Sequence, residues 1–218
     1  MNLIILGPQG SGKGTQADLL SEKFQLEHVD MGKALRQIAE QGGPLGKKIY
    51  EIQNIKKELV PGDIFRQILN LKLNSVDGEK GVILDGAPRK ISQIPDVQET
   101  FLRHGRKINK VIYINIPQEE SVQRISKRWM CENCKKPFIM GQDIHDFQDK
   151  CPACHSNIIQ RLDDTPDGVK KRLSVFKKET VPVIEYFRKN GKTIEVSGLK
   201  SIDEVFNEIV NNLKDVVK

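Results

Sequence analysis

Short apolar runs alternate with amphipathic stretches along this chain. The amphipathic stretch Thr15–Phe24 predicts a helix directly behind the first apolar run. Four apolar runs predict strands, and these are Asn2–Leu6, Val82–Leu84, Lys110–Ile116 and Thr193–Val196. Strands that alternate with helices imply right-handed crossovers and a mainly parallel sheet. The pattern therefore predicts an α/β fold in three layers, with helices on both faces of the sheet.

The last helix has the clearest pattern. Ser201 and Glu204 form a capping-box pattern at its start. A stripe of helical spacing follows, formed by Ile202, Val205, Phe206, Ile209, Val210, Leu213 and Val216. We expect these apolar residues to belong to the core and not to a cofactor site.

Two segments do not follow the alternation. Residues 31–75 have a helical pattern without a strand, broken at Gly42-Gly43-Pro44 and again near Pro61-Gly62. Residues 129–160 lack helical periodicity and contain every cysteine of the chain. We interpret both segments as insertions in a single sheet-based core.

Composition and charge narrow the class of protein. The 218 residues are 38% hydrophobic and 29% charged, as in soluble globular proteins. No apolar run approaches the roughly 18 residues of a membrane-spanning helix. No basic segment precedes the first strand, so we expect no signal peptide, no membrane partner and a cytoplasmic location. The net charge of +6 suits nucleotides, nucleic acid or simply a solvated surface.

A glycine-rich loop lies between the first strand and the first helix. Glycines allow successive backbone N–H groups to point at one anion, and the helix adds the positive end of its dipole. Gly14 separates Lys13 from Thr15, whereas the common pattern has Ser or Thr directly after the lysine. The sequence predicts a phosphate loop on a P-loop NTPase-type sheet, and an empty structural turn is the alternative. The predicted nucleotide-binding residues are Gly10, Ser11, Gly12, Lys13, Gly14 and Thr15.

Two C-x-x-C knuckles hold the cysteines. Cys131 and Cys134 form the first, and Cys151 and Cys154 form the second, with 16 residues between the two knuckles. Four thiolates at this spacing can surround Zn²⁺ tetrahedrally and leave no open position for catalysis, so we expect a structural zinc site. Iron or cobalt suits the same ligands, and a redox pair is the competing interpretation. The neighbouring His145 and His155 are alternative ligands that we interpret as loop residues.

Asp85 follows a predicted strand, at the edge where open parallel sheets bind their ligands. A carboxylate beside a phosphate loop suits Mg²⁺, directly or through water, and the alternative is a turn or capping residue. Five arginines are scattered along the sequence, and each by itself is more typical of a surface. They are Arg36, Arg89, Arg128, Arg161 and Arg172.

Together these residues resemble adenylate kinase, in the longer form with a zinc-binding lid, over essentially the whole chain. The matching motifs are Gly7–Gln16, Gly32 with Leu35-Arg36, Leu59-Val60, Asp85–Arg89 with Gln93, both knuckles, Gln160–Asp164 and Arg172-Leu173. The resemblance implies a helical insertion that binds the monophosphate, residues 31–60, and a zinc-binding lid, residues 129–161. It implies a core of residues 1–30, 61–128 and 162–218.

The resemblance also implies a reaction and roles for residues. Magnesium-dependent transfer of a phosphoryl group from ATP to AMP would give two ADP, and lid closure would exclude water. The implied catalytic residues are Lys13, Asp85, Arg89, Arg128, Arg161 and Arg172. Beyond the phosphate loop, ATP would contact Arg124, Arg128, Phe138 and Lys200. AMP would contact Met31, Arg36, Glu58, Leu59, Val60, Gly86, Arg89, Gln93, Arg161 and Arg172.

Several positions depart from the family pattern. They are Met31, Lys33, Gly62, Ala87, Lys90, Lys127 and Phe138. Met31 replaces a threonine that contacts the base, and Lys33 replaces an aspartate that helps to organise the magnesium waters. Because methionine offers a flexible apolar contact instead of a fixed hydrogen bond, relaxed base selectivity is one hypothesis. Neutral drift with AMP still preferred is the other.

Two further functions stay open. A kinase of the same architecture with another main monophosphate acceptor is the closer alternative. A non-catalytic P-loop zinc protein that binds nucleic acid is the more distant one. The cysteine segment has few aromatic residues and mixed charges, which argues against nucleic-acid binding. We therefore expect no nucleic-acid partner. Nothing in the sequence indicates the oligomeric state.

Overall fold

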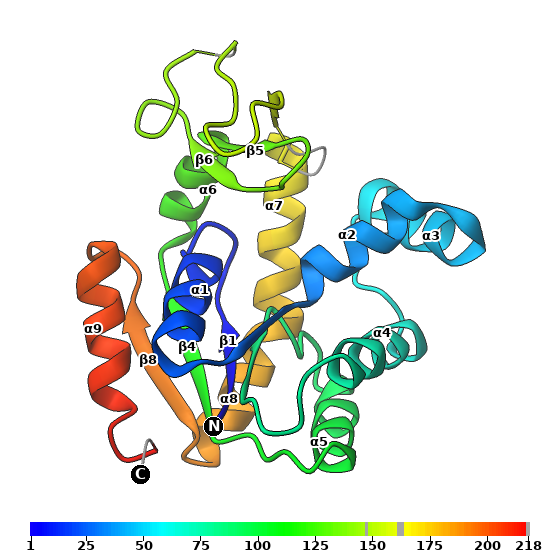
Figure 1. Ribbon diagram of the computed structural model, residues 1–218, viewed down its shortest axis with the longest axis vertical. Helices are drawn as coiled ribbons and strands as arrows, with labels where there is room; N and C mark the ends of the chain where they lie inside the picture. The colour runs from blue at the N-terminus through cyan, green and yellow to red at the C-terminus, as the bar shows by residue number, and fades with distance from the viewer. Residues whose placement is uncertain (147, 161–163, 217–218) are drawn as a thin grey trace.

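The computed structural model describes residues 1–146, 148–160 and 164–216 (Figure 1). Its centre is a five-stranded parallel sheet in the order β2-β3-β1-β4-β8. The strands are β1 (Asn2–Leu6), β2 (Glu27–Asp30), β3 (Val82–Asp85), β4 (Lys110–Asn115) and β8 (Thr193–Ser197). The predicted parallel sheet is therefore confirmed, and sequence patterning missed β2, an edge strand in which Val29 is the one apolar residue.

Helices cover both faces of the sheet and bury two apolar clusters. On one face lie α1 (Lys13–Phe24) and α9 (Ile202–Asn212), with Leu20 and Ile209 in the core. On the other lie α4 (Gly62–Asn74), α5 (Gln93–Arg103) and α8 (Val181–Lys189). Because β1, β3 and β4 are apolar towards both layers, they are buried almost completely, as central parallel strands are.

The capping box of the last helix and most of its apolar stripe are as predicted, but the expectation that Ile202 belongs to the core is wrong. Ile202 is 53% exposed and lines the large pocket, because it is the first residue of the helix and lies beyond the part that packs on the sheet. The Ser201 hydroxyl accepts from the Glu204 N–H at 3.3 Å, and the Glu204 carboxylate accepts from the Ser201 N–H at 2.9 Å, so the capping box is confirmed. The helix ends at Asn212, and Val216 therefore packs on the core from beyond it. Within the described part of the chain, no helix is long and apolar enough to cross a bilayer.

The first insertion is a helical arm. It consists of α2 (Met31–Gln41), α3 (Gly43–Tyr50) and a short π-helix, η1 (Glu51–Lys56), and extends to one side of the sheet in Figure 1. Gly46 allows α2 and α3 to pack closely, because a Cβ there would lie 2.5 Å from the carbonyl oxygen of Ile38. The two helices therefore form one compact unit.

The second insertion is a small antiparallel sheet in the order β6-β5-β7. Its strands are β5 (Arg128–Cys131), β6 (Pro137–Ile139) and β7 (Ile158–Ile159). It stands on α6 (Gln118–Ser126) and α7 (Pro166–Val175), above the carboxyl edge of the central sheet (Figure 1). A short π-helix, η2 (Phe176–Thr180), continues α7 into α8. We call this insertion the lid.

Candidate active site

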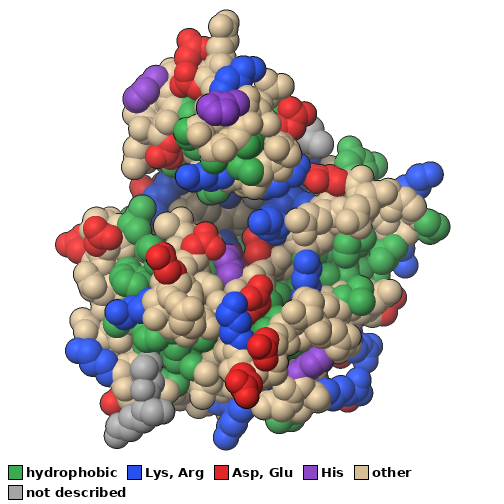
Figure 2. Space-filling view, viewed as in Figure 1, with side chains coloured by type: hydrophobic (Ala, Val, Ile, Leu, Met, Phe, Trp, Pro, Cys, Tyr) green, Lys and Arg blue, Asp and Glu red, His purple; other side chains and the backbone are tan. Residues whose placement is uncertain are grey.

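A cleft of about 2040 Å³ lies at the carboxyl edge of the central sheet, between the lid and the helical arm. Figure 2 shows the hollow beneath the lid with lysine and arginine side chains around it. Its walls include the glycine-rich loop, the β2–α2 junction, the end of β3, the underside of the lid and the segment before α9. Pockets for a single small ligand measure about 300–1,000 Å³, so this cleft has room for two nucleotides.

The glycine-rich loop has the backbone of an anion-binding loop. Gly10 and Gly12 adopt left-handed φ angles of 78° and 85°, which glycine adopts without strain. Gly12 is the N-cap of α1 and has no side chain to accept the helix N–H groups, so a bound anion can take that place. Ser11 is 3% exposed, and its Oγ has no hydrogen-bond partner among the described residues. An orphaned buried hydroxyl inside this loop fits a phosphate oxygen.

Lys13 extends along the same loop, where its Nζ donates to the Pro8 carbonyl oxygen at 3.2 Å. Burial of the ammonium lowers its pKa to about 8; Asp85 opposes this effect, while Arg89 and Arg128 add to it. Desolvation and neighbouring cations thus disfavour a charge that lysine normally keeps. A polyphosphate in the loop would favour the ammonium form, so the site is electrostatically prepared for an anion.

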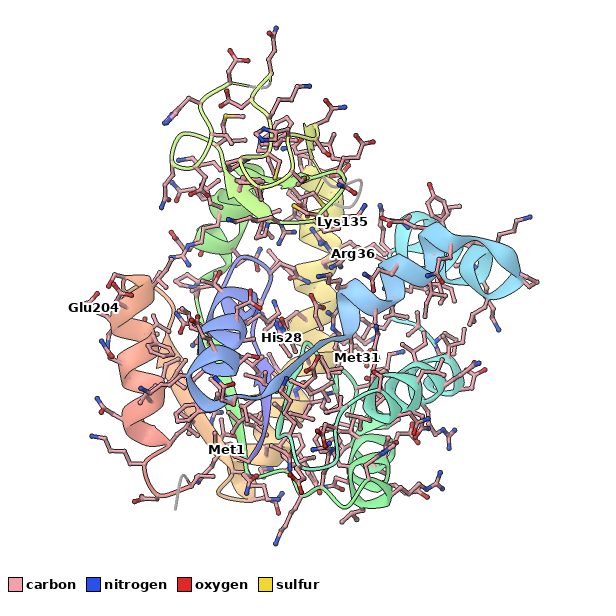
Figure 3. The ribbon with its side chains drawn as sticks, in the orientation of Figure 1. Met1, His28, Met31, Arg36, Lys135 and Glu204 are labelled. Carbon is pink, nitrogen blue, oxygen red and sulfur yellow. The ribbon has the colours of Figure 1, made fainter. Side chains whose placement is uncertain are left out.

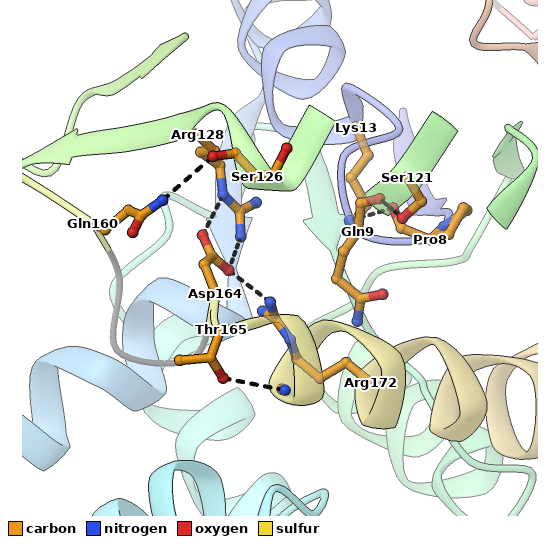
Figure 4. Close-up of polar contacts among 11 residues, drawn as sticks. Pro8, Gln9, Lys13, Ser121, Ser126, Arg128, Gln160, Asp164, Thr165 and Arg172 are labelled. Carbon is orange, nitrogen blue, oxygen red and sulfur yellow. Dashed lines mark hydrogen bonds and ion pairs between the residues drawn. The ribbon is translucent and has the colours of Figure 1, made fainter. Parts of the chain in front are cut away.

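Two of the predicted arginines, Arg128 and Arg172, pair with the carboxylate of Asp164, for which the sequence indicated no role. Asp164 accepts from Arg128 Nε at 2.8 Å and Nη2 at 2.6 Å, and from Arg172 Nη2 at 2.6 Å (Figure 4). The Asp164 side chain is 0% exposed. This pairing joins lid strand β5 to α7 and orders both guanidinium groups at the cleft. Arg161, the third arginine predicted here, lies outside the described residues.

The predicted acceptor residues line the opposite side of the cleft. Arg36 on α2 lies 3.9 Å from the Asp30 carboxylate, and Arg89 Nε donates to the Gly86 carbonyl oxygen at 2.6 Å. Gln93 Oε1 accepts from the Arg89 N–H at 2.8 Å and so fixes the turn after β3. The remaining predicted residues, Met31, Glu58, Leu59, Val60 and Gly86, line the same cleft. The fold therefore brings these acceptor residues to one place.

Met31 is more buried than the hypothesis of a flexible contact to the base assumes. It is 2% exposed and belongs to the apolar cluster beneath the arm. Packing on that side restricts its side chain. Met31 therefore forms part of the apolar wall of the cleft beside the predicted acceptor residues.

Asp85 lies at the floor of the cleft beside a histidine. The parallel register pairs Asp85 with Asp30, and His28 Nε2 lies 3.5 Å from Asp85 Oδ2. His28 Nδ1 contacts Asp18 Oδ1 at 2.7 Å. Burial by itself would lower the pKa of His28, but its contacts with Asp18 and Asp85 raise it to about 10. His28 is thus a cation at neutral pH that holds Asp85 from behind. Sequence reasoning missed it because it lies in the unrecognised strand β2.

Asp85 suits the magnesium role that the sequence predicts. A Cβ on Gly14 would lie 3.7 Å from Asp85 Oδ2, so this carboxylate is next to the start of α1 and the phosphate loop. Hard oxygen ligands beside phosphate groups are what Mg²⁺ prefers. The donor set therefore fits a metal that is bound together with a nucleotide.

The segment predicted to contact the donor base is fastened to the phosphate loop. Gln16 Nε2 donates to the Ile202 carbonyl oxygen at 2.9 Å. Arg124 Nη1 donates to the Gly10 carbonyl oxygen at 3.3 Å, and its Nε pairs with Glu120 at 2.6 Å. Lys200 Nζ pairs with Glu208 at 2.8 Å. The Lys200 ammonium group is thus paired with a carboxylate of α9, so a nucleotide base would contact the backbone of Lys200 and not its charge.

The four cysteines form one cluster in the lid. Their sulfur atoms lie within 4.8 Å of one another, with Cys131–Cys154 at 3.3 Å and Cys134–Cys151 at 3.6 Å. Zn–S bonds of about 2.3 Å place the sulfurs of a tetrahedral site about 3.8 Å apart. The Ser156 backbone and hydroxyl, with Cys131, lower the pKa of Cys154 to about 5. The cluster can therefore bind a metal ion as predicted.

Phe138 lies among these cysteines in the small core of the lid. It is buried and also borders the cleft. Phe138 therefore supports the lid core, and little of its surface is open to the cleft.

The comparison with known families agrees with this site. The family model described as "Adenylate kinase" matches residues 5–192. The chain belongs to the adenylate kinase family. An adenylate kinase of Dehalococcoides mccartyi is 38% identical over 213 residues, 98% of each chain. One of Archaeoglobus fulgidus is 40% identical over 209 residues, 96% of each, and one of Thermosipho africanus is 36% identical over 214 residues, 98% of this chain and all of the relative.

Membership of the adenylate kinase family accounts for the cleft as a whole. The matched region begins in β1 and includes the phosphate loop, the helical arm, Asp85 and the lid. The chain and these relatives are similar over nearly their full lengths, so neither insertion is peculiar to this protein. The resemblance stated from the motifs is confirmed.

We expect ATP binding to take up a proton at pH 8.5. At pH 8.5 most molecules of the free protein carry Lys13 as the neutral amine, because its pKa is about 8. Bound phosphates raise this pKa, so Lys13 gains a proton when ATP binds. Calorimetric titration in two buffers of different ionisation enthalpy measures the uptake. At pH 7 the uptake is close to zero, because Lys13 is already charged.

Lys13→Arg is the control for this experiment, since a guanidinium stays charged at pH 8.5. It should bind ATP with heats that do not depend on the buffer. Buffer-independent heats from the unaltered protein at pH 8.5 would contradict the assignment of a low pKa to Lys13.

Asp164→Ala should lower the free energy of unfolding by about 3–5 kcal/mol, because it removes a buried carboxylate from two arginines. Urea denaturation measures the change. Asp167→Ala, at an exposed carboxylate in the first turn of α7, is the matched control and should cost about 1 kcal/mol or less. Equal effects of the two substitutions would show that Asp164 does not organise the site.

Removal of the lid metal should lower the melting temperature. The lid core consists of few residues, so we expect a metal bound by the four cysteines to contribute much of its stability. Calorimetry with and without a chelator measures the shift, and Cys131→Ser should reproduce it. Affinity for ATP at the phosphate loop should fall less than thermal stability. An unchanged melting temperature after verified metal loss would disprove a structural metal.

Proposed function

We propose that this protein is a nucleoside monophosphate kinase that catalyses the reversible reaction ATP + AMP = 2 ADP. The observation that carries the proposal is the meeting of a phosphate loop and two groups of arginines in one cleft with room for two nucleotides. A kinase needs its donor and acceptor phosphates side by side and in line. Membership of the adenylate kinase family supports the same reaction.

The donor occupies the phosphate-loop side. The loop amides, Ser11 and Lys13 bind the β- and γ-phosphates, and Gly14 and Thr15 begin the helix that faces them. Arg124 packs against the donor base, and the backbone near Lys200 contacts its edge. The bond from Gln16 to Ile202 supports this arrangement, because it joins the base segment to the loop that binds the phosphates.

The acceptor occupies the arm side. Arg36 and Arg89 bind the monophosphate, since planar guanidinium forks suit two phosphate oxygens at once. Gln93 and Gly86 hold the turn that carries Arg89. Met31, Glu58, Leu59 and Val60 form the base pocket, and the buried Met31 gives it a fixed apolar wall.

Transfer is direct. An oxygen of the acceptor phosphate forms a bond to the γ-phosphorus of ATP while the bond from that phosphorus to the β,γ-bridging oxygen breaks. The two products are both nucleoside diphosphates, and no covalent enzyme intermediate is needed. Arg128, Arg172 and the predicted Arg161 neutralise the moving charge from the lid side. The closed lid excludes water, which would otherwise accept the phosphoryl group.

Two metals complete the proposal. Magnesium bound with ATP supplies charge neutralisation of the phosphate oxygens, and Asp85 would hold it, directly or through water. Zinc is the metal we propose for the four cysteines, because four thiolates in a tetrahedral arrangement are its typical structural ligands.

A cytoplasmic location and the absence of a nucleic-acid partner stay predictions from the sequence.

Base selectivity is the second question at this site. A fixed apolar wall at Met31 offers no hydrogen bond that distinguishes adenine from other bases, which favours relaxed use of monophosphates. Burial of Met31 also limits how far the pocket can adapt, which favours one preferred acceptor. AMP is the acceptor we propose, with another monophosphate as the alternative.

The decisive assay offers Mg-ATP together with AMP, GMP, CMP or UMP and measures diphosphate products by chromatography. We expect ADP from ATP with AMP far above an AMP-free control. Lys13→Met should lower kcat by about 10²–10³, the usual loss when a group that stabilises transition-state charge is removed. Lys48→Met, at an exposed lysine on α3, is the matched control and should leave kcat unchanged.

The four acceptors separate the remaining alternatives. Comparable product with all of them would establish relaxed selectivity, and product with a monophosphate other than AMP would identify a different kinase. No product with any acceptor would overturn the proposed reaction. Salt-sensitive binding of RNA or DNA by such an inactive protein would then favour the nucleic-acid alternative.

A further inference from the structure

One ion pair joins the lid to the helical arm across the cleft. Lys135 Nζ donates to Glu40 Oε1 at 2.9 Å, although the two residues are 95 positions apart. Lys135 comes from the knuckle region of the lid, and Glu40 lies near the end of α2. Figure 3 shows Lys135 beneath the lid and close to Arg36 on the arm. Both Lys135 and Glu40 line the cleft.

The knuckle fixes the position of Lys135. It follows Cys134 directly and has a left-handed φ of 61°, which a non-glycine residue adopts only where its surroundings demand it. The Cys134 N–H points at Cys131 Sγ at 3.4 Å, so a tight turn around the metal ligands precedes Lys135. Its side chain is 27% exposed and leaves the turn towards the arm. The same turn that gathers the thiols therefore directs this lysine.

Glu40 lies on the helix that carries the acceptor arginine. Arg36 is four residues earlier on α2, on the same side of the helix by the 3.6-residue period. The start of α2 is fixed by Asp30, whose carboxylate accepts from the Lys33 N–H at 2.8 Å. Close packing at Gly46 joins α2 to α3. A contact at Glu40 therefore restrains the end of α2 that is farther from the sheet.

We propose that Lys135 is a positioning residue for the monophosphate acceptor. Its ion pair with Glu40 holds α2 beneath the lid, and Arg36 is thereby kept at the acceptor phosphate. Lys135 thus acts on the acceptor through α2, without contact with the reacting atoms. This inference rests on the proposed acceptor site, which the experiment below tests separately.

The size of the effect follows from exposure. Glu40 is 55% exposed, so the pair is screened by water and salt, and such pairs contribute modestly. We expect Lys135→Glu or Glu40→Lys to raise the KM for AMP about three- to tenfold, since like charges then face each other. Neither kcat nor the KM for ATP should change more than about twofold, because the phosphate loop and lid arginines are untouched.

The double variant Lys135→Glu/Glu40→Lys tests the pairing itself. It restores opposite charges across the cleft and should recover most of the lost affinity for AMP. Raised salt should reduce the difference between each single variant and the unaltered protein, because the ion pair is exposed. Lys48→Glu is the matched control: it alters the net charge as Lys135→Glu does, on an exposed face of α3, and should leave the KM for AMP unchanged.

A binding measurement gives an independent readout. Trp129 is the single tryptophan of the chain and lies on β5 at the cleft, so its fluorescence reports on the lid. AMP titrated in the presence of a non-hydrolysable ATP analogue should require three- to tenfold more AMP for the single variants, by the same argument as for KM. Thermal melts of each variant identify any that fail to fold, and Glu40→Gln serves as a milder substitution in that case.

The variant Arg36→Ala tests the proposed acceptor site separately from the positioning role of Lys135. If it leaves the KM for AMP unchanged, the proposed acceptor site is wrong. If Arg36→Ala weakens AMP while Lys135→Glu and Glu40→Lys do not, the positioning role of Lys135 is overturned. If the single variants weaken AMP and the double variant fails to recover it, the effect does not come from the pairing of Lys135 with Glu40, which also overturns the positioning role.

Discussion

The ion cluster of Asp164 with Arg128 and Arg172 is the interaction on which the cleft depends. A site for two phosphorylated nucleotides concentrates positive charge, and without substrate the cationic side chains repel one another. Asp164, with a side chain that is 0% exposed, supplies a buried anion between the two guanidinium groups. It also ties lid strand β5 to α7, so electrostatic balance and lid attachment come from the same carboxylate.

The central sheet supplies the second constraint. Parallel strands end at the same edge, so Asp30 and Asp85 lie side by side and the phosphate loop follows the neighbouring β1. The cation His28 holds Asp85 from below, while Lys13 approaches it from the loop. Carboxylates and cationic groups therefore lie next to one another on the floor of the cleft.

The insertions convert this floor into an enclosed site. The lid has a small core of its own around four cysteines, and the arm is built on a closely packed pair of helices. Neither covers the cleft by itself. The ion pair between Lys135 and Glu40 joins them, and it extends from the turn that gathers the thiols to the helix that bears Arg36. The cysteine cluster and the proposed acceptor site are therefore joined by one ion pair, although their chemistry is separate.

The sequence by itself determined what local patterns encode. Spacing and apolar runs predicted the glycine loop, both knuckles, the capping box at Ser201 and the buried central strands. The family motifs added the positions of the helical arm and the lid along the chain. Strand β2 escaped detection because its edge position tolerates polar residues. Only the tertiary structure decided that Asp164 joins Arg128 to Arg172 and that Lys135 meets Glu40. The physical reason is that such pairs depend on chain crossings that bring distant residues together, and no short-range pattern records which charges will face each other.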